Sequence, residues 1–339
     1  QWCSVMRWEK ATRPFLRTAE FLWQEGHTVH ATAEEAQEET MQMLHVYRDF
    51  CEKNLAIPVY CGQKSEKEKF AGARATYSVE AMMQDGKALQ SGTSHNFGTN
   101  FSEPFEIKYL DKDGTQKYAH ETSWGVSTRL IGAIIMTHGD ERGLKLPPMI
   151  APIQVVVVPV AAHKEGVLEG AKAVADKLTA AGLRVKFDDR DNVTPGWKFN
   201  EWELKGVPVR VEVGPRDLAE GKVLSVRRDT FEKAPLDIEG LEGEIKAMVD
   251  AIQTNMFEIA RAFRDEHTAD VHSMEELEKQ VNGGYAKAMW CGEQACEDEI
   301  KDRFGASSRC MPFDQTPIGE TCVCCGKPAK KVIYFAKAY

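Results

Sequence analysis

The first 30 residues alternate short apolar runs with polar and basic positions. "WCSVMRWE" and "FLRTAEFLWQE" have the composition of β-strands, and "KATRP" between them has that of a turn. This pattern predicts an antiparallel pair of strands joined by a long basic connection. From residue 55 to 150, short β-segments such as "AIPVYCG" and "YSVEAMM" alternate with turns such as "QDGK", which is typical of a mainly antiparallel sheet.

Two helices are predicted within this first region. "HATAEEAQEETMQMLHVYRDFCEKN" begins with a capping box formed by Thr32 and Glu35. Its apolar residues recur at helical spacing on one face: Ala36, Met43, Leu44, Tyr47 and Phe50. "TRLIGAIIMTHGD" is a second, apolar helix, and the prolines of "LKLPPMIAP" end it. We therefore expect a domain boundary near residue 150.

The pattern changes beyond this point. "IQVVVVPV" is an apolar run of the kind buried on both faces of a sheet, and "EGVLEGAKAVADKLTAAG" is a helix ended by Gly182. Strands and helices then alternate, which predicts an α/β domain with a largely parallel sheet. A long helix over roughly 240 to 265 follows, and Ser273 with Glu276 forms a second capping box. The expected domains are residues 1–150, 151–254 and 255–339.

Composition narrows the class of protein. Of 339 residues, 42% are hydrophobic and 28% are charged, as in soluble globular proteins. No apolar run approaches the ~18 residues that would span a membrane. The net charge of −9 argues against coating nucleic acid by bulk attraction, although one domain can still carry a local basic surface.

The nine cysteines are unevenly placed, and six lie in the last fifty residues. Without a secretory signal they indicate a reducing compartment. Cys291 and Cys296 form one pair, and Cys322 forms a second with Cys325, since two intervening residues let both sulfurs converge. Cys324 is the alternative fourth ligand. Two such pairs predict a structural Zn²⁺ site with four thiolate ligands.

Arginines approach the first apolar strands. Arg7 and Glu9 are two residues apart, so on a strand they share one face. Arg129 follows in "SWGVSTR", at a predicted strand–helix junction. Two guanidinium groups in one cleft would suit a triphosphate, because each can bind phosphate oxygens bidentately. Composition alone favours the other reading, in which surface arginines pair with the many glutamates.

Longer stretches carry a family resemblance. "VMRWEKATRPFLRTAEFLWQEGH" resembles motif 2 of class II aminoacyl-tRNA synthetases, and "SWGVSTRLIGAIIMTHGDERGLKLPP" resembles their motif 3. With "KFAG", "LQSGTSHNFGTNF" and the Cys-rich tail, essentially the whole chain resembles prolyl-tRNA synthetases of the eukaryotic and archaeal type. The sequence has no counterpart of motif 1, so we expect it to be a fragment of a longer protein.

The resemblance implies an overall α/β fold in three parts. An α+β catalytic domain with an antiparallel sheet comes first, then an α/β anticodon-binding domain, then a small α+β zinc-bearing domain. It also implies a cytoplasmic homodimer that uses L-proline, ATP with Mg²⁺, and tRNA(Pro). The basic segment "GKVLSVRRDTFEK" either contacts tRNA phosphates or is a solvated charged face. It contains Lys222, Arg227, Arg228 and Lys233.

Roles for individual residues also follow from the resemblance. Arg7 would hold the ATP α-phosphate and the amino-acid carboxylate, and Arg129 would hold the γ-phosphate. The remaining expected ATP contacts are Glu9, Arg17, Thr18, Gln90, Thr93 and Ser127. The expected proline pocket consists of Trp23, Glu25, His27, Phe70 and His95, together with Arg7. An aromatic wall with a nearby anion suits a cationic secondary amine ring.

The implied reaction forms prolyl adenylate from proline and ATP, and then transfers the prolyl group to the 3′-terminal ribose of tRNA. It needs no protein nucleophile, only held reactants and neutralised charge. One alternative is a non-catalytic paralogue that binds tRNA or senses amino acid, which the presence of Arg7, Arg129, Trp23 and Glu25 argues against. Another is a synthetase for threonine, but no His/Cys triplet for its zinc precedes residue 150.

Overall fold

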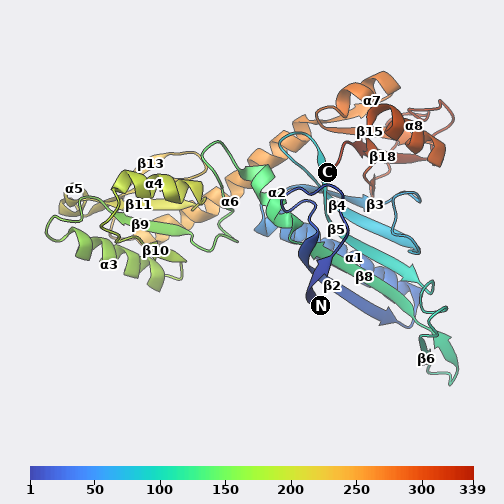
Figure 1. Cartoon of the computed structure of the whole chain (residues 1–339), viewed down its shortest axis with the longest axis horizontal. Coiled ribbons are helices and arrows are strands. Elements are labelled where there is room, and N and C mark those ends of the chain that lie inside the picture. The colour runs from blue at the N-terminus through green and yellow to red at the C-terminus, as the bar shows by residue number, and fades with distance from the viewer. The chain divides into compact units, whose positions relative to one another are not determined.

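A computed structural model describes all residues from 1 to 339. The chain divides into two compact units, drawn in Figure 1. The first comprises residues 1–52, 57–137 and 261–339, and the second comprises residues 53–56 and 138–260. Each unit is described by itself. The domain boundaries expected at residues 150 and 254 stay predictions.

The first unit is built on a seven-stranded sheet in the order β1-β2-β8-β5-β4-β3-β17, with every neighbouring pair antiparallel. The mainly antiparallel sheet expected from the short β-segments is thus confirmed. The strands are β1 (Trp2–Met6), β2 (Glu20–His30), β3 (Val59–Gln63), β4 (Ala75–Met82), β5 (Ala88–Gly98), β8 (His120–Ser127) and β17 (Met311–Pro312). A separate hairpin joins β6 (Lys108–Leu110) to β7 (Gln116–Tyr118).

Helix α1 (Ala33–Asp49) packs on one face of this sheet (Figure 1). The predicted capping box is confirmed, since the Thr32 side chain accepts from the Glu35 N–H and the Glu35 side chain accepts from the Thr32 N–H. The sheet reaches the helix through polar bonds as well, because Ser94 Oγ donates to the Thr40 carbonyl at 2.7 Å. A π-helical turn, η1 (Phe50–Asn54), follows α1. Helix α2 (Arg129–His138) occupies the predicted apolar segment.

Residues 267–339, here called the C-terminal module, form a second sheet in the first unit, in the order β14-β15-β18-β16. Only half of the predicted second capping box is present, since Ser273 accepts from the Glu276 N–H, whereas the Glu276 side chain accepts from the His272 N–H. The module also supplies β17, which pairs with β3 at the edge of the seven-stranded sheet. Its other elements are β14 (Thr268–Val271), α7 (Met274–Gln280), β15 (Tyr285–Trp290), α8 (Gln294–Phe304), β16 (Ser307–Ser308) and β18 (Lys331–Ala336).

The second unit contains a five-stranded sheet in the order β10-β9-β11-β12-β13. Only β10, β9 and β11 run parallel, whereas β12 and β13 are antiparallel additions, so the expected largely parallel sheet is a mixed one. Short connections explain this, because a parallel crossover needs a dozen or more residues. The strands are β9 (Val155–Pro159), β10 (Val185–Phe187), β11 (Val209–Val213), β12 (Lys222–Arg227) and β13 (Lys233–Asp237). The helices are α3 (Val167–Ala180), α4 (Pro195–Leu204), α5 (Pro215–Ala219) and α6 (Leu241–Glu266).

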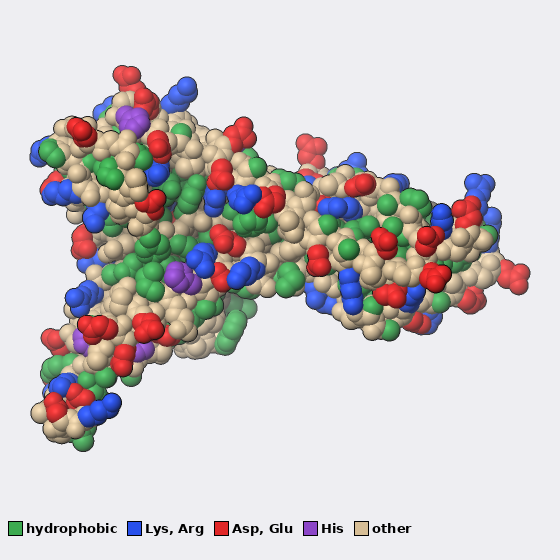
Figure 2. All heavy atoms as spheres, turned by 180° about the vertical axis from the view of Figure 1, so that it is seen from behind, with side chains coloured by type: hydrophobic (Ala, Val, Ile, Leu, Met, Phe, Trp, Pro, Cys, Tyr) green, Lys and Arg blue, Asp and Glu red, His purple; other side chains and the backbone are tan.

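Two arginines of the basic segment around β12 form ion pairs. Arg227 binds Asp229 through two nitrogens, at 3.0 and 2.7 Å, and the buried Arg228 binds Asp140 at 2.9 and 2.7 Å. Both guanidinium groups are therefore held by carboxylates of their own unit, and phosphate contact by this segment stays a prediction. On the face drawn in Figure 2, acidic and basic side chains are interspersed over the second unit.

Glycine is required where β2 lies beside β8. Gly26 is the register partner of Trp124, and a Cβ on Gly26 would lie 2.2 Å from Trp124 Cε2. Real Cβ atoms do not approach so closely. The indole therefore occupies the space that any other side chain at position 26 would fill.

We expect Gly26→Ala to reduce the free energy of unfolding by about 1–3 kcal/mol, because the added methyl forces Trp124 from its site. Urea unfolding followed by tryptophan fluorescence measures this. Gly243→Ala is the control, since a Cβ on Gly243 meets nothing within 4 Å and alanine favours the helix. Equal stability of the Gly26 and Gly243 variants would contradict the packing described.

Candidate active site

A pocket of about 530 Å³ lies on the sheet face opposite α1. Side chains alternate along each strand, so Trp23 and Glu25 line the pocket while Gln24 between them accepts a hydrogen bond from Tyr47 of α1 at 2.7 Å. The walls come from β2, β4, β5 and β8, which are neighbours in the sheet (Figure 1). One face thus packs the core, and the other is free to carry ionisable groups.

The pocket gathers most residues that the sequence assigned to a site. Those that line it are Arg7, Glu9, Arg17, Thr18, Trp23, Glu25, Phe70, Gln90, Thr93, His95, Ser127 and Arg129. His27 is the exception. It follows Glu25 on the same face of β2, with its Nε2 3.5 Å from Glu25 Oε2, and its side chain is more than half exposed.

Arg7 lies just after β1, with its guanidinium over two aromatic rings. Its Cζ is 5.1 Å from the ring centroid of Phe21 and 5.7 Å from that of Trp23. The two rings themselves meet edge to face at 5.8 Å. Aromatic faces attract the cation and restrict its position. No ion pair neutralises Arg7 in the structure, so its charge remains available to a ligand.

Arg129 begins α2 and is held by backbone oxygens. Its Nε donates to the Leu16 carbonyl at 3.1 Å, and its Nη1 donates to the Gln90 carbonyl at 3.3 Å. Burial lowers the pKa of Arg129 from its ordinary value, and the positive charge of Arg17 lowers it further. The guanidinium nevertheless stays charged at neutral pH.

Arg7, Arg17 and Arg129 thus place three guanidinium groups around one cavity. Only Arg17 has a carboxylate partner there, since its Nη1 lies 3.5 Å from Glu9 Oε2. Like charges in a partly buried site repel one another, and a polyvalent anion would relieve that repulsion. The electrostatics of the pocket therefore favour a phosphate-bearing ligand.

Aromatic rings and one carboxylate form another part of the wall. Trp23 donates from Nε1 to Cys3 Sγ at 3.0 Å, and Phe70 lies 5.1 Å from the His95 ring. His95 Nδ1 is 2.9 Å from Thr76 Oγ1. Burial is the main cause that lowers the pKa of His95 to about 4, and His27 is the second. The ring is therefore neutral at pH 7. Glu25 is left as the anionic group of this wall.

A β-bulge explains why Gln90 and Thr93 both face the pocket although three positions separate them. Val79 pairs with Gly92 and Glu80 pairs with Gln90, so Ser91 is an extra residue in β5. The bulge shifts the alternation by one position and turns Gln90 toward the same side as Thr93. The local signal in the sequence is Gly92, because an isolated glycine inside a strand often marks a bulge.

Several lining residues were not anticipated from the sequence. Thr76 lies opposite His95 in the register of β4 and β5, and Trp124 fills the space over Gly26. Lys64 is buried at the edge of the pocket. The others are Phe15, Leu16, Phe21, Glu68, Ser91, Gly92, Ser123, Gly125 and Val126. Strand alternation could have identified Phe21, whereas the rest depend on register and loop placement.

Four cysteines of the C-terminal module converge on one point. The sulfurs of Cys291, Cys296, Cys322 and Cys325 all lie within 4.8 Å of one another, whereas Cys324 is outside the group. The Cys291 Sγ atom is 3.6 Å from that of Cys296 and 3.7 Å from that of Cys325. Tetrahedral thiolates with Zn–S bonds of about 2.3 Å would stand about 3.8 Å apart. The donor set and spacing therefore fit zinc.

Sequence comparisons agree with this arrangement. An antiparallel sheet backed by a helix, with arginines around a pocket on its other face, defines the catalytic domain of a class II aminoacyl-tRNA synthetase. Residues 1–138 match the family described as tRNA synthetase class II core domain (G, H, P, S and T). Residues 154–248 match "Anticodon binding domain", and residues 274–339 match "Prolyl-tRNA synthetase, C-terminal".

Similar curated proteins are bacterial. They include proline–tRNA ligase 2 of Bacillus thuringiensis, 59% identical over 341 residues, and the proline–tRNA ligases of Clostridium novyi and Lachnoclostridium phytofermentans, each 60% identical over 341 residues. Each alignment covers 100% of this chain and 71% of the relative. The chain belongs to the prolyl-tRNA synthetase family.

His95 is half-buried and neutral at pH 7, so the free energy of unfolding depends on pH. The folded-state pKa lies below the ordinary value of 6.5, so the stabilising contribution is complete above pH 6.5 and is lost as the pH falls toward 4. Relative to His95→Gln, the wild-type chain should lose up to roughly 3 kcal/mol of unfolding free energy over that range. Urea unfolding at a series of pH values measures the difference, and a constant difference would contradict the half-buried neutral ring.

Proposed function

We propose that this chain is a proline–tRNA ligase, which joins L-proline to tRNA(Pro) through prolyl adenylate and releases AMP and diphosphate. Relatives that are about 60% identical to this chain over its full length are named proline–tRNA ligases, and this supports the activity. The observation that carries it is the meeting of Arg7 and Arg129 around one pocket with Trp23 and Glu25. Residues far apart in the sequence thereby contribute the groups that the reaction needs.

In the first step, a proline carboxylate oxygen attacks the α-phosphorus of ATP. A bond forms between them, and the bond from the α-phosphorus to its bridging oxygen breaks, so diphosphate leaves. Arg7 would lie over the α-phosphate and the carboxylate, and Arg129 over the γ-phosphate. Mg²⁺ bound with ATP would neutralise further phosphate charge. Since both reactants are anionic, catalysis consists of holding them together and offsetting their charge.

The remaining proposed ATP contacts surround these arginines. Glu9 and Arg17 form an ion pair in the motif 2 loop, and Thr18 ends that loop. Gln90, Thr93 and Ser127 come from β5 and β8, on the pocket face. Hydroxyl and amide groups suit hydrogen bonding to ribose and adenine rather than charge neutralisation.

Proline would lie against Trp23 and Phe70, whose rings fit an apolar five-membered ring. Its cationic secondary amine would face the Glu25 carboxylate. A neutral His95 adds no charge that would repel the amine. His27 would act through Glu25, because its ring lies beside that carboxylate rather than in the pocket wall.

In the second step, a hydroxyl of the 3′-terminal ribose of tRNA would attack the prolyl carbonyl carbon and displace AMP. The anticodon-binding match in the second unit supports tRNA as the partner. We further propose a cytoplasmic homodimer with the domain arrangement of the eukaryotic and archaeal type, a type that the bacterial relatives do not establish. No helix is long and apolar enough to cross a membrane.

The four thiolates of Cys291, Cys296, Cys322 and Cys325 would hold Zn²⁺ in a closed structural site. Such an ion leaves no position for substrate, so its contribution is folding energy for the C-terminal module. Three of the four cysteines are buried, which suits a structural ion more than an exchangeable one.

Proline-dependent exchange of labelled diphosphate into ATP tests the activity directly. We expect exchange with L-proline and none with threonine. Exchange with threonine would overturn the specificity, and a lack of exchange with every amino acid would favour a non-catalytic paralogue.

Arg7→Ala and Arg129→Ala should each lower kcat/KM for this exchange by about a hundredfold to a thousandfold, because each removes a cation from the developing charge. Binding of tRNA(Pro), measured by filter retention, should stay within about twofold of wild type, since the anticodon-binding part is unchanged. Retention of full exchange activity in either variant would remove that arginine from the mechanism.

Zinc analysis tests the ligand set. We expect about one zinc per chain in the wild type. Cys322→Ser should lose that zinc and Cys324→Ser should retain it, because Cys322 is one of the four clustered cysteines and Cys324 is not. Plasma mass spectrometry of the purified variants measures the metal. If Cys324→Ser loses zinc while Cys325→Ser keeps it, Cys324 is the fourth ligand.

A further inference from the structure

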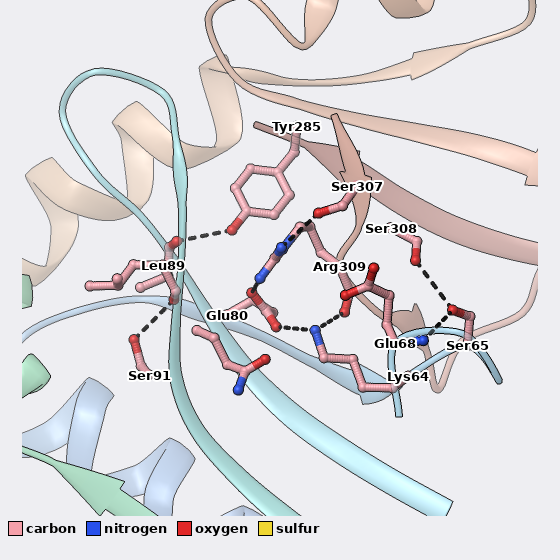
Figure 3. Close-up of polar contacts among 12 residues, drawn as sticks. Lys64, Ser65, Glu68, Glu80, Leu89, Ser91, Tyr285, Ser307, Ser308 and Arg309 are labelled. Carbon is pink, nitrogen blue, oxygen red and sulfur yellow. Dashed lines mark hydrogen bonds and ion pairs between the residues drawn. The ribbon is translucent and has the colours of Figure 1, made fainter. Parts of the chain in front are cut away.

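Two buried carboxylates join the C-terminal module to segments that line the pocket, and Figure 3 shows the contacts around one of them. Glu80 lies on β4 of the catalytic sheet, and Glu297 lies on α8 of the module. Both are buried, at 0% and 3% exposure. A charged group this deeply buried is costly unless it is paired, so its partners indicate what the fold must hold together.

Glu80 binds one cation from each side of this contact. Lys64 Nζ donates to Glu80 Oε1 at 2.9 Å, and Arg309 donates to Glu80 Oε2 from Nε at 3.1 Å and from Nη2 at 2.8 Å. Lys64 Nζ also donates to the Arg309 carbonyl at 2.7 Å, which closes the cluster. Arg309 Nη1 donates to Ser307 Oγ at 3.0 Å.

The charges in this cluster are matched to its burial. Burial alone would raise the pKa of Glu80, but Arg309 and Lys64 together bring that pKa below its ordinary value. Conversely, burial alone would lower the pKa of Arg309, and Glu80 raises it. The carboxylate is therefore ionised, and Arg309 is the partner that binds it through a guanidinium fork.

The position of Glu80 links the cluster to the pocket. Glu80 is the register partner of Gln90, and cross-strand partners share one face of a sheet. The Gln90 carbonyl accepts a hydrogen bond from Arg129, and Lys64 itself lines the pocket. A displacement of Glu80 would thus move Gln90, and with it the backbone carbonyl that accepts the hydrogen bond from Arg129.

Glu297 makes a second connection a short distance along the chain from Lys64. It accepts hydrogen bonds from Ser65 Oγ at 2.7 Å and from Ser308 Oγ, and Ser308 immediately precedes Arg309. Glu297 also follows Cys296, one of the four clustered thiols. The segment that binds Ser65 is therefore anchored at the cysteine cluster.

The module also contacts the β4–β5 hairpin away from the ionic cluster. The Tyr285 hydroxyl donates to the Ala81 carbonyl at 2.9 Å, and the Tyr339 hydroxyl bonds Asp85 in the turn. Ala88 at the start of β5 donates its N–H to the Lys337 carbonyl at 2.8 Å. The hairpin that carries Gln90, Thr93 and His95 is thus held by the C-terminal module along much of its length.

We propose that the C-terminal module is a positioning element of the active site, in which Arg309 and Glu297 hold β4–β5 and residues 64–68 in the geometry that adenylate formation requires. Neither residue touches substrate, so both are positioning residues. The inference rests on the proposed function for its catalytic consequence, because it assumes that ATP binds beside Gln90 and Arg129.

Arg309→Met tests this without stranding Glu80, which keeps Lys64 as its partner. Arg303→Met is the matched control, since Arg303 lies in the same module but forms an exposed pair with Glu299 at 3.5 Å. In diphosphate exchange well below the unfolding temperature, Arg309→Met should lower kcat/KM for ATP by about tenfold to a hundredfold, as a displacement near 1 Å can do. Arg309→Lys should recover part of this loss, and Arg303→Met should match wild type.

Hydrogen exchange provides a readout that does not need activity. We expect faster amide exchange over residues 88–95 in Arg309→Met, and unchanged rates there in Arg303→Met. A lower unfolding temperature with unchanged kcat/KM and unchanged exchange over residues 88–95 would mean that Arg309 only stabilises the fold, and would overturn the inference. If the wild-type chain lacks proline-dependent activity, the proposed function fails, and the exchange rates over residues 88–95 still decide whether Arg309 positions β5.

Discussion

The alternation of side chains along antiparallel strands determines most of what this chain can do. On β2, Gln24 faces α1 and bonds Tyr47, while Trp23 and Glu25 on either side of it face the pocket. A sheet packed by a helix on one face only has room for charged groups on the other. The same strand can therefore support the core and carry ionisable groups without burying an unpaired charge.

Electrostatics then distinguish two kinds of charge in the first unit. Arg7 and Arg129 have no carboxylate partner, and both line the pocket. Glu80, the register partner of the pocket residue Gln90, is satisfied by Lys64 and Arg309 and is fully buried. Charges left unpaired mark the site, and the paired ones fix the geometry of the strands that form it.

This division gives the C-terminal module a physical connection to the catalytic sheet. The module supplies β17 to the sheet, Arg309 to Glu80, and Glu297 to Ser65. Cys296, one of the four clustered cysteines, lies in α8 directly before Glu297. A metal that stabilises the module would in this way also stabilise the position of β5, although it lies outside the reacting groups.

Local pattern predicted those features of the fold that depend on nearest neighbours in the chain. The strand pair at the N-terminus, the capping box of α1, the Ser273 cap of α7 and the long helix α6 all follow from local pattern, because the interacting groups are close to one another in the chain. The family resemblance pointed to site residues that, apart from His27, all line the pocket. It could do so because the resemblance rests on residue types at given positions in the sequence and not on their packing.

Long-range register decided the rest. The bulge at Ser91, the antiparallel addition of β12 and β13, the pairing of Arg228 with Asp140, and the burial of Glu80 between Lys64 and Arg309 leave no periodic trace in the sequence. Each depends on which segments meet, and a shift of one residue would send a side chain to the opposite face. The sequence by itself determined the elements and the chemical types at the site. The tertiary structure alone decided which charges stay open to a ligand, because that depends on partners brought together from distant parts of the chain.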